Sequence, residues 1–133
     1  IGSKTFFMSM PDTFFYGQKP YSILDPTPDI ADVACWKIRP EQHGKLGQVK
    51  QDAKYITDIK DKKKDCDYIY SWGAMTFSRK LEPFIDIKDP HVGYALEKAV
   101  NSGSNLTYKN IEGEYFDCGT PDEYLSLLTK LIN

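Results

Sequence analysis

The sequence lacks a cysteine pattern, a long apolar run and an excess of one charge. Its cysteines, Cys35, Cys66 and Cys118, are widely spaced and form no C-x-x-C pair. Neither a disulfide framework nor a zinc site is therefore predicted, and we expect reduced, mostly buried thiols. No apolar run approaches the roughly 18 residues of a membrane span, and Ile1-Gly2-Ser3-Lys4 shows no signal-peptide pattern. We expect a cytoplasmic protein without a membrane partner.

The charge balance argues against nucleic acid as a partner. The sequence has 17 Lys and Arg against 19 Asp and Glu, so its net charge of -2 provides no basic surface. His43 and His91 have no ligand or triad spacing and receive no role. With 133 residues, 41% of them hydrophobic, the chain can bury one core, and we expect a single domain over residues 1–133. Because it opens with Ile1 and not Met, we expect the natural protein to begin elsewhere.

Short apolar runs separated by turn residues predict several strands in the first half. A buried strand is expected at Thr5–Met10, where Pro11-Asp12 ends it. Further strands are expected at Ile30–Ile38, Leu46–Gln51, Tyr55–Ile59 and Asp67–Phe77. Leu46–Gln51 and Tyr55–Ile59 are expected to form a hairpin. The charged run Lys60–Asp65 is expected to be a loop between strands.

Helical spacing dominates the second half. One helix is predicted with Leu81, Phe84 and Ile85 on one face, and another over Tyr94–Val100. A third is predicted from Thr120 to Leu131, with Thr120 and Glu123 forming a capping box around Pro121. Short strands are expected at Leu106–Lys109 and Tyr115–Cys118. The predicted fold is an α/β domain with a mixed sheet.

The segment Gly113–Leu125 carries the strongest functional signal. It combines a strand ending in Asp117, a glycine turn and a capped helix. Such a junction presents side chains and backbone N–H groups at a sheet edge, where α/β proteins commonly bind ligands. Asp117 and Thr120 equally suit ordinary turn and capping duties, so the spacing alone leaves both interpretations open.

This segment resembles the closing motif of sugar-1-phosphate nucleotidyltransferases, in which an aspartate after a G-x-Y strand precedes a G-T-P turn. Four earlier segments resemble the family in the same order, and together the five extend from about residue 5 to residue 128. Met10–Phe15 resembles the family's segment with a strand-end aspartate, and Gly44–Val49 resembles its segment with a sugar-contacting glycine. Ile56–Lys62 resembles the family's V-x-x-I-x-E-K segment, and Tyr70–Phe77 resembles the strand that carries a second sugar-site glycine.

The resemblance implies a mixed-sheet α/β sandwich forming the second half of a Rossmann-like nucleotidyltransferase domain. Such enzymes join a nucleoside triphosphate and a sugar-1-phosphate into a nucleotide-sugar and release pyrophosphate. Asp12 and Asp117 would hold Mg²⁺, and Lys62 would meet the sugar phosphate. Asp61 would accept hydrogen bonds from hydroxyls of the sugar. Gly47 and Gly73 would let the backbone approach the sugar closely, because glycine has no Cβ. The catalytic set implied is Asp12, Asp117 and Lys62.

The sequence departs from the family pattern in two ways. Asp61 stands where the family has Glu, and Lys63 where it has Pro, so Lys62 is a weaker assignment than the two aspartates. The family's G-x-G-x-R loop has no counterpart in these 133 residues. We therefore expect the chain alone to be inactive and to need an N-terminal half or a partner chain, with a homo-oligomer left open.

A non-catalytic sugar-phosphate or nucleotide-binding module of the same fold is the alternative. Trp72 would stack on a sugar or base, or serve the core.

Overall fold

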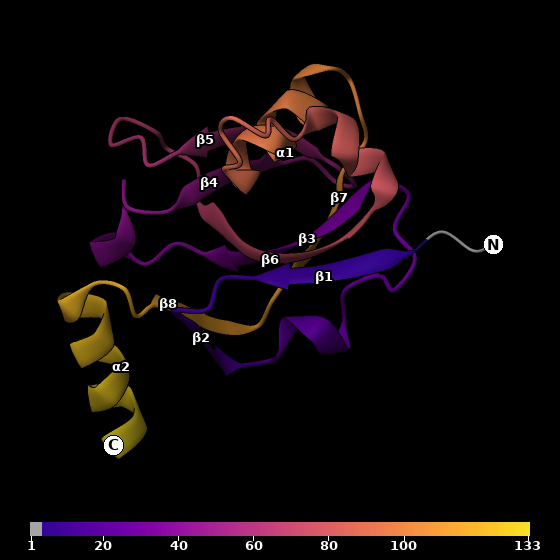
Figure 1. The fold of residues 1–133 in the computed structure, drawn as a ribbon. Coiled ribbons are helices and arrows are strands. Elements are labelled where there is room, and N and C mark those ends of the chain that lie inside the picture. Colours follow the sequence, from indigo (N-terminus) through magenta and orange to yellow (C-terminus); the bar gives the residue numbers. More distant parts are fainter. Residues whose placement is uncertain (1–3) are drawn as a thin grey trace.

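A six-stranded mixed sheet forms the centre of the computed structural model, which describes residues 4–133 (Figure 1). The strand order is β5-β4-β6-β3-β7, and β1 pairs with β6 beside this path. β3 and β7 run parallel, whereas the other pairs are antiparallel. The strands are β1 (Thr5–Ser9), β3 (Ala31–Lys37), β4 (Gly47–Gln51), β5 (Ile56–Asp61), β6 (Tyr70–Ser78) and β7 (Thr107–Asn110). The predicted mixed-sheet α/β class is confirmed.

The central strand β3 is buried on both faces because apolar side chains occupy successive positions. Val33 and Cys35 face a core that is closed by the 3-10 helix η3 (Arg79–Phe84) and the helix α1 (Val92–Asn101). Ala34 and Trp36 belong to a second core on the other side of the sheet. Figure 1 shows α1 and η3 covering one face of the main sheet.

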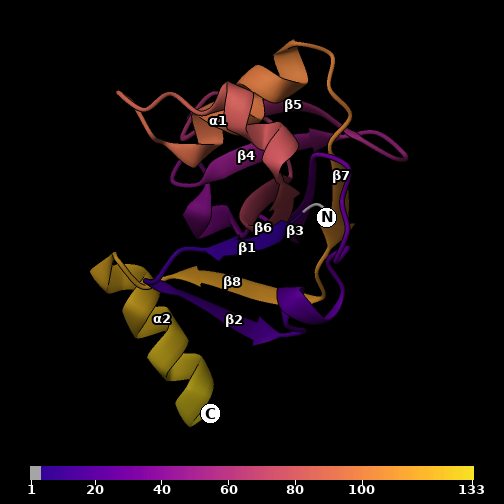
Figure 2. The same ribbon diagram turned by 45° about the vertical axis from the view of Figure 1, so that its right-hand side comes forward.

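A two-stranded ribbon covers the other face (Figure 2). It pairs β2 (Thr13–Gly17) with β8 (Gly113–Asp117) in antiparallel register. The ring of Phe15 in the ribbon stacks on Trp36 of the main sheet at 5.1 Å, and Tyr115 packs against both. An aromatic cluster within the second core thus joins the ribbon to the sheet. The short 3-10 helix η1 (Pro20–Ser22) follows β2.

A nearly buried ion pair fixes the last helix, α2 (Pro121–Ile132), to the rest of the chain. Arg39, just before the 3-10 helix η2 (Pro40–Gln42), donates from Nη2 to both carboxylate oxygens of Glu123, at 2.9 and 3.1 Å. Gln42 Nε2 donates to Glu123 Oε1 and to the carbonyl of Tyr115, each at 2.7 Å. The expected capping box is wrong, because Thr120 makes no side-chain cap bond and Glu123 is turned toward Arg39.

Three other expectations about the elements are wrong. β1 is not buried, since Phe6 and Phe7 are 39% and 46% exposed on a strand with one neighbour among the described residues. The charged run does not begin as a loop, because β5 extends to Asp61. The helix predicted with Leu81, Phe84 and Ile85 on one face is a short 3-10 helix over Arg79–Phe84, and Ile85 lies just beyond it. Pro83 lies near the end of this helix and lacks an N–H for a helical hydrogen bond, which is consistent with its short length.

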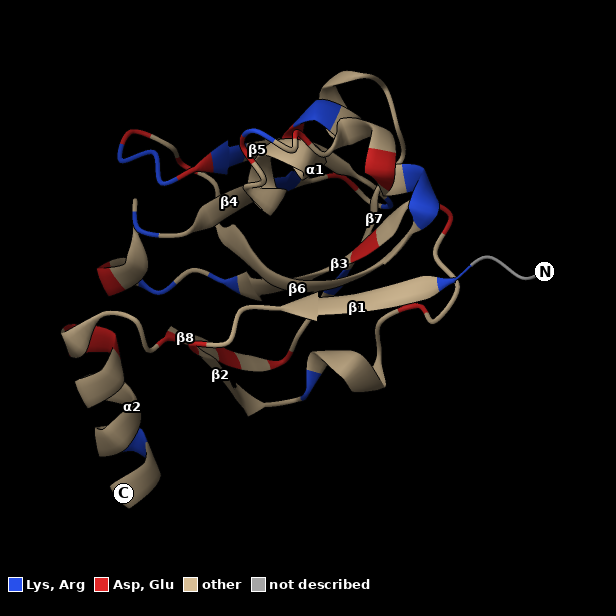
Figure 3. Ribbon diagram, viewed as in Figure 1, with Lys and Arg blue, Asp and Glu red and all other residues tan. Residues whose placement is uncertain are grey.

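Charge and thiol positions complete the description of the fold. Figure 3 shows charged residues gathered on β5 and the loop after it, whereas β1 and β6 carry almost none. All three thiols are free, but only Cys35 is buried, so the expectation of mostly buried thiols is wrong for Cys66 and Cys118. Burial raises the pKa of the Cys35 thiol to about 12. Among residues 4–133, no helix is both long and apolar enough to cross a membrane.

Candidate functional site

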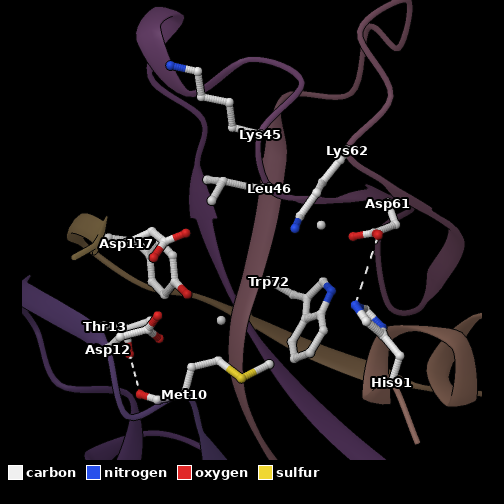
Figure 4. Close-up of a pocket in the computed structure, with 13 residues that line it drawn as sticks. Met10, Asp12, Thr13, Lys45, Leu46, Asp61, Lys62, Trp72, His91 and Asp117 are labelled. Atoms are coloured by element: carbon white, nitrogen blue, oxygen red, sulfur yellow. Dashed lines mark hydrogen bonds and ion pairs between the residues drawn. The ribbon is translucent and has the colours of Figure 1, made fainter. Parts of the chain in front are cut away.

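A pocket of about 210 Å³ lies where the ribbon meets the main sheet, and it gathers every site residue that the sequence predicted. Those residues are Asp12, Gly47, Asp61, Lys62, Gly73 and Asp117. They come from five separate segments of the chain, so the pocket forms only when these segments pack together. Figure 4 shows Asp12 and Asp117 on one side and Asp61, Lys62 and His91 on the other. We call these two sides the acidic wall and the mixed wall.

The acidic wall belongs to the ribbon. Asp12 lies in the turn between β1 and β2, and Asp117 is the last residue of β8. The register of the ribbon pairs Thr13 with Asp117, and the N–H of Cys118 donates to the carbonyl of Asp12 at 2.7 Å. These backbone contacts hold the two aspartates together although they are far apart in sequence.

The carboxylates of Asp12 and Asp117 lie close to Gly119, whose N–H donates to Asp117 Oδ1 at 3.0 Å. A methyl group added at Gly119 would lie 2.6 Å from Asp12 Oδ2 and 3.1 Å from Asp117 Oδ1, so both oxygens flank one point that only glycine leaves open. No group of three or more His, Cys, Asp or Glu side chains around one point occurs within residues 4–133. Two carboxylates nevertheless fit Mg²⁺, which commonly takes one or two from the protein and its other ligands from phosphate and water.

The negative charge of the acidic wall affects neighbouring groups. Burial raises the pKa of the Tyr115 phenol, and the charges of Asp117 and Asp12 raise it further. The pKa of the Cys118 thiol is raised by the same kinds of cause, burial first and then the two aspartates. Tyr115 and Cys118 are therefore neutral at ordinary pH.

The mixed wall belongs mainly to the main sheet. Asp61 ends β5, and Lys62 follows with a φ of 53°, a left-handed conformation that residues other than Gly, Asn and Asp seldom adopt. The Lys62 N–H donates to the carbonyl of Leu46 at 3.1 Å, which fixes this turn. In Figure 4 the ammonium group of Lys62 points into the pocket. This is the position that a residue binding an anion in the pocket requires.

The two predicted glycines have a packing reason that does not involve a ligand. A methyl group at Gly73 would lie 2.2 Å from the ring of Tyr115, and one at Gly47 would lie 2.4 Å from Nε1 of Trp72. The β3–β6 register passes from the pair Ala34–Ala74 to Cys35–Trp72, so Gly73 is the extra residue of a β-bulge. Direct contact of Gly47 and Gly73 with a sugar stays a prediction.

Sequence reasoning missed some of the residues that line the pocket. Lys45 and His91 bring charge or hydrogen-bonding groups, and Tyr115 forms part of the boundary of the pocket. His91 stands at the N-cap of α1, with its Nε2 3.9 Å from Asp61 Oδ2. Its place just before the predicted helix was the available signal, because helix starts in α/β proteins commonly face ligands. Lys45 offered a weaker signal, since it lies within a segment that resembled the family.

Comparison with known proteins gives similarity at the level of structure alone. No family model matches the sequence, and no curated protein matches it. The inositol-1-phosphate CTP transferase from T. maritima is similar with a TM-score of 0.75 at 19% identity, over 98% of this chain and 56% of that one. A UDP-glucose pyrophosphorylase complexed with UDP-glucose has a TM-score of 0.71 at 15% identity, over 99% of this chain and 57% of that one.

A putative glucose-1-phosphate thymidylyltransferase from Bacillus anthracis is also similar, with a TM-score of 0.71 at 20% identity. That similarity covers 94% of this chain and 53% of the other. The chain thus spans a little over half the length of the solved structures that it matches. Over that span it has the fold of sugar-1-phosphate nucleotidyltransferases.

Proposed function

We propose that this chain is the carboxyl-terminal half of a nucleotidyltransferase domain that makes a nucleotide-sugar and pyrophosphate. Its substrates would be a nucleoside triphosphate and a sugar-1-phosphate. One observation carries the proposal: on a nucleotidyltransferase fold, a single pocket gathers the paired aspartates of the acidic wall and the Asp61-Lys62 pair of the mixed wall. A cytoplasmic location is part of the proposal.

The reaction explains why both walls are needed. An oxygen of the sugar-1-phosphate attacks the α-phosphorus of the triphosphate, and the bond from that phosphorus to its bridging oxygen breaks as pyrophosphate leaves. Both reactants are polyanions, so positive charge must lie between them. Lys62 would bind the sugar phosphate, and Asp61 would accept hydrogen bonds from sugar hydroxyls. The sugar would therefore lie at the mixed wall.

The acidic wall would hold the metal. Asp12 and Asp117 would be the protein ligands of Mg²⁺, which when bound supplies charge neutralisation and in-line geometry for phosphoryl transfer. The backbone bond between Cys118 and Asp12 would keep both carboxylates in place as the substrates enter. The glycine-rich loop for the nucleotide phosphates would come from an N-terminal half or from a partner chain.

A non-catalytic module that binds a sugar phosphate or a nucleotide is the second candidate. The observation that favours it is that residues 4–133 present two carboxylates at the pocket edge and no third metal-binding side chain beside them. A module that only binds its ligand needs no third metal-binding side chain. The retained pair still favours the enzyme, because a module that only binds has less use for two metal-positioning acids.

Pyrophosphate release and binding, measured together, separate these cases. Residues 1–133 alone are expected to bind glucose 1-phosphate with Mg²⁺ in calorimetry and to release no pyrophosphate with any nucleoside triphosphate. A longer form of the protein, or a complex with its partner chain, is expected to release it. Turnover by residues 1–133 alone would refute the half-domain proposal. Binding without turnover in the longer form would favour the module.

A further inference from the structure

A β-bulge sets the position of Trp72. Because the β3–β6 register skips Gly73, the side chain of Trp72 lies on the same face as Cys35, in the core beneath α1. Bulges commonly redirect a side chain next to a functional site. Trp72 is only 7% exposed, yet it lines the pocket. Most of the ring thus serves the core, and one edge reaches the pocket.

The indole nitrogen of Trp72 is the polar part of that edge. In Figure 4 it points toward Asp61 and Lys62, and no hydrogen-bond partner for it occurs within residues 4–133. An indole N–H only donates, so the Lys62 ammonium, also a donor, cannot satisfy it. The nitrogen is not among the fully buried, unpartnered atoms of residues 4–133, so it is open to solvent in the pocket, and a ligand oxygen that enters can replace water as its acceptor. Gly47 leaves the space beside this nitrogen open.

His91 and Asp61 supply complementary groups on the same wall. The 3.9 Å between His91 Nε2 and Asp61 Oδ2 is too long for a hydrogen bond. A ligand hydroxyl could bridge the two, donating to the carboxylate and accepting from the imidazole. The His91 ring is held by Tyr94, with ring centres 4.5 Å apart, and Gly93 leaves room for it. Asp61 would repel a second phosphate at this place.

We propose, resting on the function proposed above, that Trp72 and His91 are specificity-determining residues that bind ring hydroxyls of the phosphorylated acceptor. Trp72 Nε1 donates to one hydroxyl oxygen, while His91 and Asp61 share a neighbouring hydroxyl. The ligand class is a polyhydroxylated ring carrying one phosphate, either a sugar phosphate or a cyclitol phosphate. The phosphate lies toward Lys62, and the ring lies over the Trp72 edge.

Nuclear magnetic resonance of the isotope-labelled chain tests this directly. The sequence has two tryptophans, and Trp36, 1% exposed and outside the pocket, is an internal reference. Titration with glucose 1-phosphate or with inositol 1-phosphate is expected to move the Trp72 indole N–H signal and leave that of Trp36 in place. Whichever of the two moves it further identifies the ring class. Inorganic phosphate is expected to leave the Trp72 signal unmoved.

Two results would overturn the inference while leaving the proposed function standing. One is calorimetric binding of either phosphorylated ring without movement of the Trp72 signal. The other is an equal movement with inorganic phosphate, which would make the indole a phosphate donor. Binding of neither ring would overturn the inference and the proposed function together.

Substitutions give an independent measurement. Trp72→Phe keeps an aromatic ring and removes the N–H, so the Kd for the bound ring phosphate should rise about fivefold, as for one net hydrogen bond, with the Kd for inorganic phosphate unchanged. His91→Phe should act similarly, because it keeps the packing on Tyr94 and loses the ring nitrogens. Trp36→Phe is the matched control, since its Nε1 is buried without a partner away from the pocket. Unchanged Kd values in both pocket variants would contradict the proposal.

Discussion

The two walls of the pocket differ in how the chain holds them. The acidic wall lies on a two-stranded ribbon, and its aspartates are joined through the backbone bond between Cys118 and Asp12. The mixed wall lies on the six-stranded sheet, where Trp72 is part of the main core. The ribbon shares a smaller core with the other face of that sheet, and the ion pair of Arg39 and Glu123 fixes the helix α2 that follows it. The acidic wall is thus carried by the smaller unit and the mixed wall by the larger.

This difference predicts that the two walls respond differently to substitution. Changes in the acidic wall should appear in the rate of the chemical step, because a metal acts on charge that develops in the transition state. Changes in the mixed wall should appear in substrate affinity, because hydroxyl and phosphate contacts are already made in the ground state.

Asp117→Asn should have the largest effect. The variant keeps the size of the side chain and removes the charge that would hold the proposed Mg²⁺, so kcat in the catalytically complete protein of that proposal should fall by at least about a hundredfold. The melting temperature should stay near that of the wild type, and both are measured by steady-state kinetics and thermal melts. Asp122→Asn, the same change at an exposed residue in the first turn of α2, is the control. Near-normal turnover would mean that Asp117 is only a turn residue.

Glu123→Ala should loosen the acidic wall through its anchor. Removing Glu123 leaves Arg39 with the exposed Glu41 as its only carboxylate partner within the described residues and takes an acceptor from Gln42, so the free energy of unfolding should fall by about 3 kcal/mol in denaturant titration. Glu82→Ala should change it by less than about 1 kcal/mol, since the Arg79–Glu82 pair is exposed. Equal losses in the two variants would show that the Arg39–Glu123 pair stabilises the fold no more than an exposed pair does.

Lys62→Ala should act on the mixed wall alone. Losing a charged contact to phosphate should raise the KM for the sugar-1-phosphate by about tenfold and change kcat little. The neighbouring Lys63, which does not line the pocket, offers a matched Lys63→Ala control. A fall in kcat without a change in KM would move Lys62 to the chemical step and remove the contrast between the walls.

The smallest effect concerns the titration of Tyr115. The charge of Asp117 helps to raise its phenol pKa, so Asp117→Asn should shift ionisation of Tyr115 to lower pH. The folded-state pKa of Tyr115 lies above the ordinary value of about 10. The stabilisation of the fold by the neutral phenol is therefore fully present below about pH 10 and is lost as the pH rises through the folded-state pKa. Ultraviolet titration of tyrosinate, with Tyr115→Phe to assign the signal, measures the shift. An unchanged titration would show that the two groups are not electrostatically coupled.

Strands and helices with a clear local pattern could be predicted from the sequence. Ile30–Ile38 and the hairpin of β4 and β5 are confirmed because apolar runs bounded by turn residues determine them. β2 was missed, since its partner β8 lies at the other end of the chain and Pro11-Asp12 resembled a loop. Pairing between distant segments leaves no local signal.

The site divides in the same manner. Asp12, Asp61, Lys62 and Asp117 were identified through segments that resemble a family, and the structure places them around one pocket. Their chemical roles stay predictions. The position of the Trp72 indole N–H at the pocket could not be predicted, because it depends on a β-bulge at Gly73 and on the space beside Gly47. Such features arise only when strands are in register.

The exposed strand β1 has a practical consequence for work with residues 1–133. Its outer edge offers unpaired backbone groups, and Phe6 and Phe7 place apolar rings beside that edge with no charge inside the strand. Edges of this kind recruit other extended chains, and natural proteins usually shield them with charge, proline or a covering element. Concentration-dependent precipitation is therefore the failure to guard against during purification, and low protein concentration will suit titrations better than the high concentrations used for crystal growth.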